Sequence, residues 1–243
     1  LEIDGTRLIN IPKFSLAAGD LKIDGSASYA EDGTGLDRVD IDQISFNRTD
    51  LAGVVIPGND GGWTVSFHGP SFDLEPSFEN LFKVSPTDED GFGLKLSLSA
   101  NVDKVWIGQK HFLKQITGTL NRAGNRWRRI SIDGALSSGE KFDVILRPSG
   151  KGKRWVKIKT TDAGNMLRTL DVYDTMIGGI LNVEATFDDT VVDHPLTGEV
   201  LISNYRLVDA PALTKLVEDM TLARLKEALQ GDGLAFREFK APF

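Results

Sequence analysis

The sequence predicts a mainly β protein, in which one long, curved antiparallel sheet forms an open apolar groove with about three short amphipathic helices. Three observations support this fold class. Apolar and polar residues alternate in many short runs, glycine-containing turns separate these runs, and only about three segments show helical periodicity. The 243 residues include 25 glycines and 9 prolines, which suits many turns rather than disorder.

The alternation is clearest from Leu94 to Val102, where apolar residues take turns with Lys95, Ser97 and Ser99. Successive side chains of a strand point to opposite faces, so each run predicts one apolar and one polar face. The turn sequences AEDGTG, GNDGG, NRAGN, SSGE and PSGKGK separate the runs. The apolar members, which we expect to line the groove, are Leu21, Ile23, Trp63, Val65, Phe67, Leu94, Leu96, Leu98, Ile130, Ile132, Phe142, Val144, Leu146, Val156, Ile158, Leu181, Val183, Phe187, Val200 and Ile202.

A first helix is expected in the segment DAGNMLRTLDVYD. Asp162 is a suitable N-cap, and Gly178 with Gly179 is expected to end the segment. Its apolar stripe consists of Met166, Leu167, Leu170 and Tyr173. We expect this stripe to lie on the strands as a plug or brace; the alternative is a helix that caps a dry core.

A second helical stretch is expected between Asp209 and Gln230, with Pro211 in its first turn and a restart near Thr221. Its first apolar stripe, assigned to the same plugging role, consists of Leu213, Leu216, Val217 and Met220. So few short helices cannot cover the apolar faces of so many strands. The strands therefore either pack against each other as a closed sandwich or leave an open apolar groove.

An internal repeat is expected. RVDIDQ at Arg38 parallels RISIDG at Arg129, and a strand beginning with Trp63 parallels one beginning near Trp155, with both pairs about 90 residues apart. The expected organisation is a single elongated piece of a longer protein over 1–243, with repeats at about 20–85 and 112–175. Residues 176–243 would form a strand pair and a C-terminal helical segment. Chance similarity among alternating strands is the alternative.

Composition and spacing argue against several function classes. The net charge of −7 disfavours nucleic acid as the main partner, and the absence of cysteine removes thiol chemistry and zinc–thiolate sites. His68, His111 and His194 stand in no metal-ligand or nucleophile spacing, and TDEDGFG lacks the glutamate that a calcium loop needs at its twelfth position. We therefore expect no enzyme, no metal and no cofactor.

A basic segment from 121 to 159 contains 11 Lys and Arg residues and three acidic residues. Two interpretations stay open. The segment is either the solvated face of two hairpins or a rim that attracts anionic headgroups or a membrane surface. The candidates for headgroup or membrane contact are Arg128, Arg129 and Arg154.

Several short motifs follow one another along the chain: an Asp-Ala-Gly helix, a Gly-Gly turn, a Gly-led strand, a (D/N)-A-P helix and G-x-G-x-x-F. These motifs fall at Asp162, Ala163, Gly164, Gly178, Gly179, Gly198, Asp209, Ala210, Pro211, Gly231, Gly233 and Phe236. With them, most of the chain from about Gly69 onward resembles the AsmA-like C-terminal region of large bacterial envelope proteins, and most closely its YhdP-type branch. GPSFDLEPSFENL resembles a further segment of the family, whereas TLARL with Arg224 departs from its usual small residue.

The resemblance implies a bridge-like lipid transfer protein that is anchored to the inner membrane and crosses the periplasm. Such a protein moves phospholipid, or another acyl-chain lipid, between the inner and outer membranes along its groove, in outer membrane biogenesis. The resemblance therefore implies that the groove-lining residues bind lipid. Neighbouring β-repeats of the same full-length chain would be its further partners. The alternative function is a structural scaffold or adaptor β-domain of the envelope that conducts no lipid.

Overall fold

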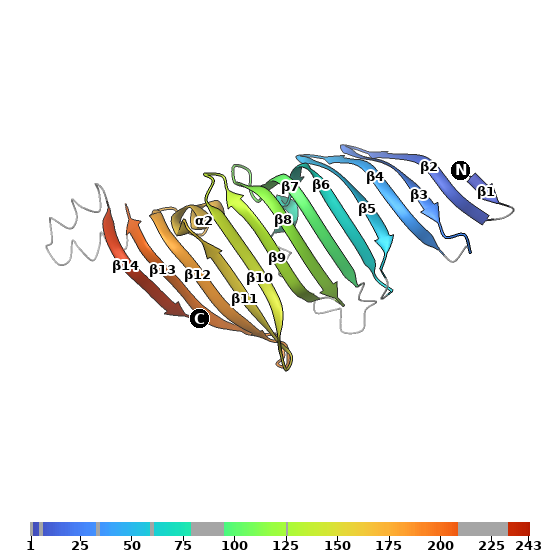
Figure 1. Cartoon of the computed structure of the whole chain (residues 1–243). Coiled ribbons are helices and arrows are strands. Elements are labelled where there is room, and N and C mark those ends of the chain that lie inside the picture. The colour runs from blue at the N-terminus through green and yellow to red at the C-terminus, as the bar shows by residue number, and fades with distance from the viewer. Residues whose placement is uncertain are drawn as a thin grey trace. The chain divides into compact units, whose positions relative to one another are not determined.

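A computed structural model describes residues 2–4, 7–32, 35–58, 61–78, 95–124, 126–208 and 233–243 (Figure 1). The described residues are mainly β, as expected, and contain 14 strands. They form two compact units, residues 1–134 and 135–243, and each unit is described by itself.

The first unit is a sheet whose strands follow one another in chain order. Its elements are β1 (Glu2–Asp4), β2 (Arg7–Ala18), β3 (Leu21–Tyr29), β4 (Leu36–Phe46), β5 (Thr49–Pro57), β6 (Trp63–Asp73), the single helical turn α1 (Glu75–Phe78), β7 (Leu96–Trp106) and β8 (Phe112–Ala123). β9 (Arg126–Leu136) follows and ends at the start of the second unit.

One pairing contradicts the expected antiparallel sheet: β6 and β7 are parallel, with Trp63 opposite Leu96 and Asp73 opposite Trp106. In the same unit, each pair of neighbouring strands from β1 to β6 is antiparallel, and so is the pair β7–β8. The prediction was wrong here because the segment between Asp73 and Leu96 is long enough to return the chain to the end at which β6 began.

The second unit contains β10 (Lys141–Gly150), β11 (Lys153–Thr160), the helix α2 (Ala163–Thr169), β12 (Met176–Asp188), β13 (Leu196–Leu207) and β14 (Leu234–Pro242). These five strands are antiparallel neighbours in chain order. The core lies between α2 and the strands below it. Leu136 is fully buried, and Phe142, Met166, Leu181 and Ile202 are each less than a tenth exposed.

The helix α2 is shorter than expected. Asp162 caps it as expected, since its Oδ1 accepts a hydrogen bond from the Asn165 amide at 2.9 Å. The helix ends at Thr169, and Asp171 has a positive φ of 57°. Tyr173 lies beyond this end and is 37% exposed. The expected stripe is therefore not one continuous buried face.

Gly178 and Gly179 were expected to end the helical segment. They lie instead within β12, with φ values of 66° and 91°. Asn204 in the neighbouring strand β13 also has a positive φ, 55°. These residues form a kink across which the buried positions step by three, from Met176 to Gly179 and from Ile202 to Tyr205. The kink keeps the same face of the sheet towards α2.

The expectation of about three helices is wrong for the described residues, where α2 is the only helix longer than one turn. The expected helical stretch from Asp209 to Gln230, with its stripe, lies outside the described residues. The order of three strands and a helix recurs, as β4–β5–β6–α1 and β9–β10–β11–α2. The internal repeat stays a prediction, because β6 is followed by a parallel strand and β11 by an antiparallel one.

Candidate functional site

In the first unit, three apolar rows cross the strands at right angles. Residues directly opposite each other on neighbouring strands share a face of the sheet, so the registers define these rows. The first row joins Ala27, Val39, Val55, Val65, Leu98 and Leu120. The second row joins Phe14, Gly25, Ile41, Gly53, Phe67, Ala100 and Gly118. The third row contains Leu16, Ile23, Ile44, Leu51, Val102 and Ile116.

The predicted lining residues of β3, β6 and β7 all belong to this face. Ile23, Val65 and Leu98 lie within the rows, while Leu21, Trp63 and Leu96 continue them towards the strand ends. Ile132 approaches this face from β9, because a Cβ atom on Gly118 would lie 3.3 Å from its Cγ1. Ile130 shares its parity in β9. Leu94 lies outside the described residues.

The side chains of the middle row rise little above the sheet because phenylalanine rings lie over glycines. A Cβ atom on Gly25 would come within 2.9 Å of the Phe14 ring, and one on Gly53 within 2.6 Å of the Phe67 ring. These rings therefore lie along the sheet instead of standing away from it. The result is an apolar face with little relief along its middle row.

The second unit presents a comparable apolar face. One row joins Phe142, Thr160, Leu181, Ile202 and Phe239, a second Val144, Ile158, Val183, Val200 and Ala241, and a third Leu146, Val156, Ala185 and Gly198. Phe187 continues the face beyond the third row, opposite Arg154 and Leu196. The structure thus brings all the predicted lining residues of this unit onto one face.

Some residues of these rows were not predicted from the sequence, although they lie on the same apolar face. Val39, Ile41 and Val55 lie in strands whose alternation is interrupted by Asp42–Gln43 or shortened by a turn. Register, rather than alternation alone, places them on the apolar face.

The helix α2 lies on the apolar face of the second unit. A Cβ atom on Gly179 would lie 3.4 Å from the Cβ of Ala163 and 3.2 Å from Ile202. Ala163, Met166 and Thr169 form its buried side, whereas Leu167 and Leu170 are half-buried. The helix therefore covers the end of the face near the kink, and its role as a plug or brace, rather than as the cap of a dry core, stays a prediction.

The opposite face of the first unit is polar. Ser66 and Ser99, which are paired across β6 and β7, form a hydrogen bond of 2.7 Å between their hydroxyls, and Asn121 donates to the Ser97 hydroxyl at 3.0 Å. In the second unit, Lys157 forms an ion pair of 2.6 Å with Glu184 on the corresponding face. Each unit therefore has one apolar face and one mainly polar face, on which Val54 and Ile56 of the first unit and Ile145 and Leu201 of the second also lie.

The polar face of the first unit contains a depression of about 470 Å³, lined by Lys13, Asp24, Asp42, Gln43, Asp50, Leu51, Ala52, His68, Gly69 and Pro70. Hydrogen bonds from Ser15 and Lys22 lower the pKa of Asp24. No group of three or more histidine or carboxylate residues in the described part of the chain could hold a metal ion.

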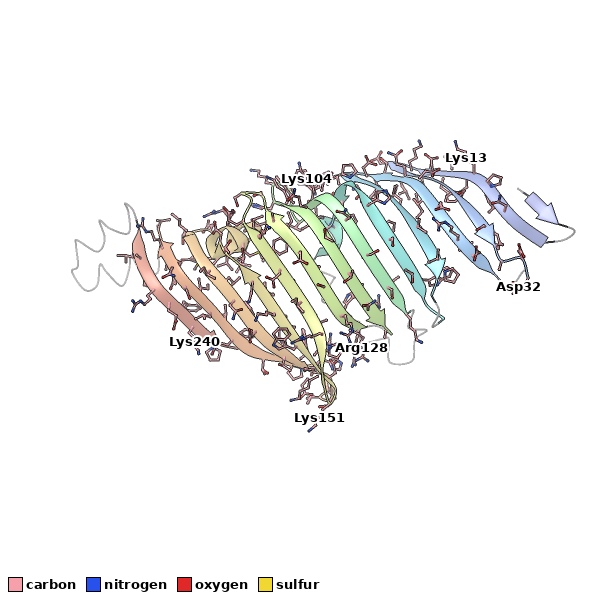
Figure 2. The ribbon with its side chains drawn as sticks, viewed as in Figure 1. Lys13, Asp32, Lys104, Arg128, Lys151 and Lys240 are labelled. Atoms are coloured by element: carbon pink, nitrogen blue, oxygen red, sulfur yellow. The ribbon has the colours of Figure 1, made fainter. Side chains whose placement is uncertain are left out.

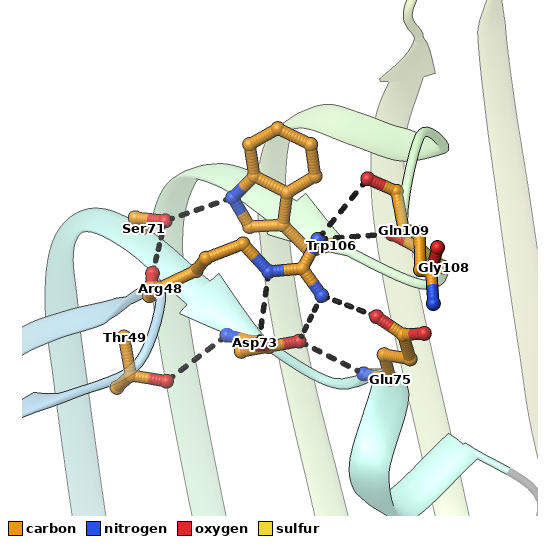
Figure 3. A network of polar contacts seen from close by, with 8 residues as sticks. All are labelled: Arg48, Thr49, Ser71, Asp73, Glu75, Trp106, Gly108 and Gln109. Carbon is orange, nitrogen blue, oxygen red and sulfur yellow. Dashed lines mark hydrogen bonds and ion pairs between the residues drawn. The ribbon is translucent and has the colours of Figure 1, made fainter. Parts of the chain in front are cut away.

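Sequence reasoning missed a network centred on Arg48 (Figure 3). Its guanidinium donates to Asp73 at 2.8 and 2.9 Å, to Glu75, and to the Gly108 carbonyl at 3.1 Å, and it lies 4.7 Å from the Trp106 ring centroid. The hydrogen bond to Asp73 raises the pKa of Arg48 above its usual value. The network joins the β4–β5 turn to the end of β6 and to the β7–β8 turn, beside the parallel pair.

The three arginine candidates differ in environment. Arg128 and Arg129 are exposed in β9. Arg154 is only 9% exposed and donates to Asp189 at 2.7 and 2.8 Å, while its guanidinium lies 4.7 Å from the Phe187 ring. Arg154 therefore stabilises the end of the sheet and is poorly placed to bind a headgroup.

No protein-family model, curated protein or solved structure matches the chain. Within the described residues, no helix has the length and apolar character needed to cross a bilayer.

Proposed function

We propose that the protein is a non-enzymatic lipid-binding segment, and that acyl chains lie on the apolar face of each unit. The supporting observation is that each unit has one face of continuous apolar rows, whereas its other face mixes hydroxyl, amide and charged side chains with a few apolar ones such as Val54 and Ile145. Most members of these rows outside the α2 contact are only half-buried, including Val65, Leu98 and Val183.

The physical advantage is the removal of methylene groups from water. Each buried methylene is worth about 0.8 kcal/mol, so a lipid gains stability from a long apolar surface without specific contacts. From Leu96 to Val102 the first unit offers six residue steps of about 3.3 Å, or about 20 Å. One leaflet of the ~30 Å bilayer core is about 15 Å deep, so an acyl chain fits on this length.

The resemblance to AsmA-like proteins extends this proposal to the full-length chain. In that view the apolar faces line an open groove of a periplasmic, inner-membrane-anchored protein, which carries phospholipid between the two membranes beside further β-repeats. A structural scaffold that conducts no lipid is the alternative, and it predicts that no lipid occupies the apolar faces.

The test pairs substitutions on opposite faces of the same strand. Leu98→Arg and Val183→Arg place a charge on the apolar face, whereas Ser97→Arg and Thr186→Arg place the same charge on the polar face. Native mass spectrometry of the purified chain with phosphatidylglycerol should show bound lipid for the wild type and for the polar-face variants, and its loss for the apolar-face variants.

Circular dichroism should confirm that all four variants remain folded. Absence of bound lipid in the wild type, or equal binding by all four folded variants, would leave the scaffold as the better account.

A further inference from the structure

We propose that one end of the second unit is a membrane contact that inserts into the surface of a bilayer. This region, which we name the tip, consists of residues 149–152, which form the end of β10 and its turn into β11, and residues 189–195 between β12 and β13. Figure 2 shows Lys151 at its extremity. The proposal goes beyond lipid binding by the apolar faces and does not require it.

The tip presents two adjacent apolar side chains to solvent. Val192 is 84% exposed, more than any other large hydrophobic residue of the described chain, and Val191 is 49% exposed. Single exposed apolar residues are common on protein surfaces. Two adjacent exposed valines in one loop form a small apolar patch that water solvates poorly.

The loop that carries these valines is firmly tied to the turn between β10 and β11. Arg154 binds the Asp189 carboxylate with two hydrogen bonds, and the Asp189 amide donates to the Gly152 carbonyl at 2.8 Å. The His194 amide donates to the Val191 carbonyl at 3.2 Å, which closes a turn around the valines. The valines are therefore held outward by an ordered framework to which their own side chains contribute little.

The chemistry around the valines suits a lipid surface better than a protein groove. At the tip and the adjoining strand ends, Lys151, Lys153 and Arg154 are matched in number by Asp188, Asp189 and Asp193, and Arg147 beside Trp155 adds one further cation. Asp188 and Asp189 are engaged by Lys153 and Arg154, so Lys151, with Asp193 as the nearby acidic residue, is the exposed cation at the extremity. Cations beside a small apolar insertion favour an anionic leaflet.

An aromatic residue stands behind the tip at a suitable depth. Trp155 lies on the polar face, with the guanidinium of Arg147 at 4.5 Å and the ammonium of Lys157 at 5.5 Å from its ring centroid. It follows Lys151 by four residues, or about 13 Å along the strand. Interfacial segments bury about 5–10 Å into the headgroup boundary, so Trp155 would stand at headgroup level, where tryptophan is enriched.

The absence of cysteine allows a direct test. Val192→Cys, labelled with the environment-sensitive fluorophore NBD, should shift to the blue and brighten when vesicles of phosphatidylcholine mixed equally with phosphatidylglycerol are added. The matched control is Ile180→Cys, which places the same label at another exposed apolar site of the unit, 52% exposed in β12. This label should stay in water.

Substitution provides the affinity measurement. In vesicle co-sedimentation, Val191→Asp/Val192→Asp should weaken binding at least tenfold, which corresponds to about 1.4 kcal/mol, while Ile177→Asp/Ile180→Asp should leave it unchanged. Lys151→Glu should weaken binding several-fold at low salt, and only to vesicles that contain phosphatidylglycerol.

A blue shift of both labels alike, or unchanged co-sedimentation of the valine variant, would overturn the proposal. No vesicle binding by the wild type would overturn it as well and would leave the valines as a site for a protein partner. Val183→Arg separates the two proposals, because it should abolish lipid capture on the apolar face and leave vesicle binding by the tip intact.

Discussion

Substitution of Gly164 by alanine tests whether α2 is docked as closely on β12 as the structure indicates. Helix propensity alone predicts stabilisation, because glycine is about 1 kcal/mol less favourable than alanine in a helix interior. The packing predicts the opposite. A Cβ atom at this position would lie 2.3 Å from the Met176 carbonyl oxygen, 2.7 Å from its carbonyl carbon and 3.1 Å from the Ile177 amide nitrogen.

These three atoms belong to the backbone of β12, so no side-chain rotation can relieve the contact, and the helix must move away from the strand. Overpacking of this kind typically costs about 1–3 kcal/mol. The cost should be near the upper end because the obstacle is rigid. After the gain in propensity is subtracted, we expect Gly164→Ala to lower the free energy of unfolding of the second unit by about 1–2 kcal/mol.

Urea denaturation followed by circular dichroism measures the global effect, and amide hydrogen exchange measures the local one. The Met166 amide, which donates to the Asp162 carbonyl at 3.1 Å, should exchange faster in the variant. Gly108→Ala is the control, because a Cβ atom there meets nothing closer than 3.9 Å. If Gly164→Ala stabilised the chain by about the propensity difference, the close docking of α2 would be refuted.

Two further predictions concern the ends of β11 and β12. Asp189→Asn should destabilise the second unit by about 3–5 kcal/mol in urea denaturation, because it removes the charge that balances the buried guanidinium of Arg154; an effect no larger than that of an exposed substitution would contradict this. Hydrogen bonds from the Thr190 hydroxyl and amide lower the pKa of Asp188, so this carboxylate stabilises the fold above its unfolded pKa of about 3.9 and loses that effect as the pH falls through its folded value. Thr190→Val should raise the pKa of Asp188 towards the ordinary value in an NMR titration, and an unchanged titration would show that the hydroxyl plays no part.

Much of the apolar face could be predicted because a strand's alternation depends only on its own sequence. Val144, Leu146, Val156 and Ile158 lie on one face in the structure because each strand has the period of two that was noted. The predicted residues share a face in each unit, but lipid binding by that face stays a prediction.

The direction of a strand has no such local signal. The sequences of β6 and β7 are compatible with antiparallel and parallel pairing alike, and the choice depends on where the segment between Asp73 and Leu96 returns. Gly178 and Gly179 had the composition of a helix stop, yet positive φ values also occur at a kink within paired strands. Local pattern could not separate these two uses of glycine.

Contacts between residues far apart in sequence were equally hard to predict. Arg48 binds Asp73, 25 residues away, and the Gly108 carbonyl, 60 residues away. Arg154 was counted in a basic segment, but its partner Asp189 lies 35 residues further along and outside that segment. Local charge density therefore gave the wrong environment for this residue.

The parallel pair also has a consequence for the order of folding. Hairpins close over short distances, as where Pro57 meets Trp63 six residues later, whereas Trp63 meets Leu96 only after 33 further residues. Loop closure over the longer segment has the larger entropic cost, and pairing of this kind forms slowly. The antiparallel strands up to β6 and the β7–β8 hairpin are thus expected to form separately. The pairing of β6 with β7 is expected to be the slowest folding step of the first unit. The network around Arg48 spans this seam and would lock it once the two parts have met.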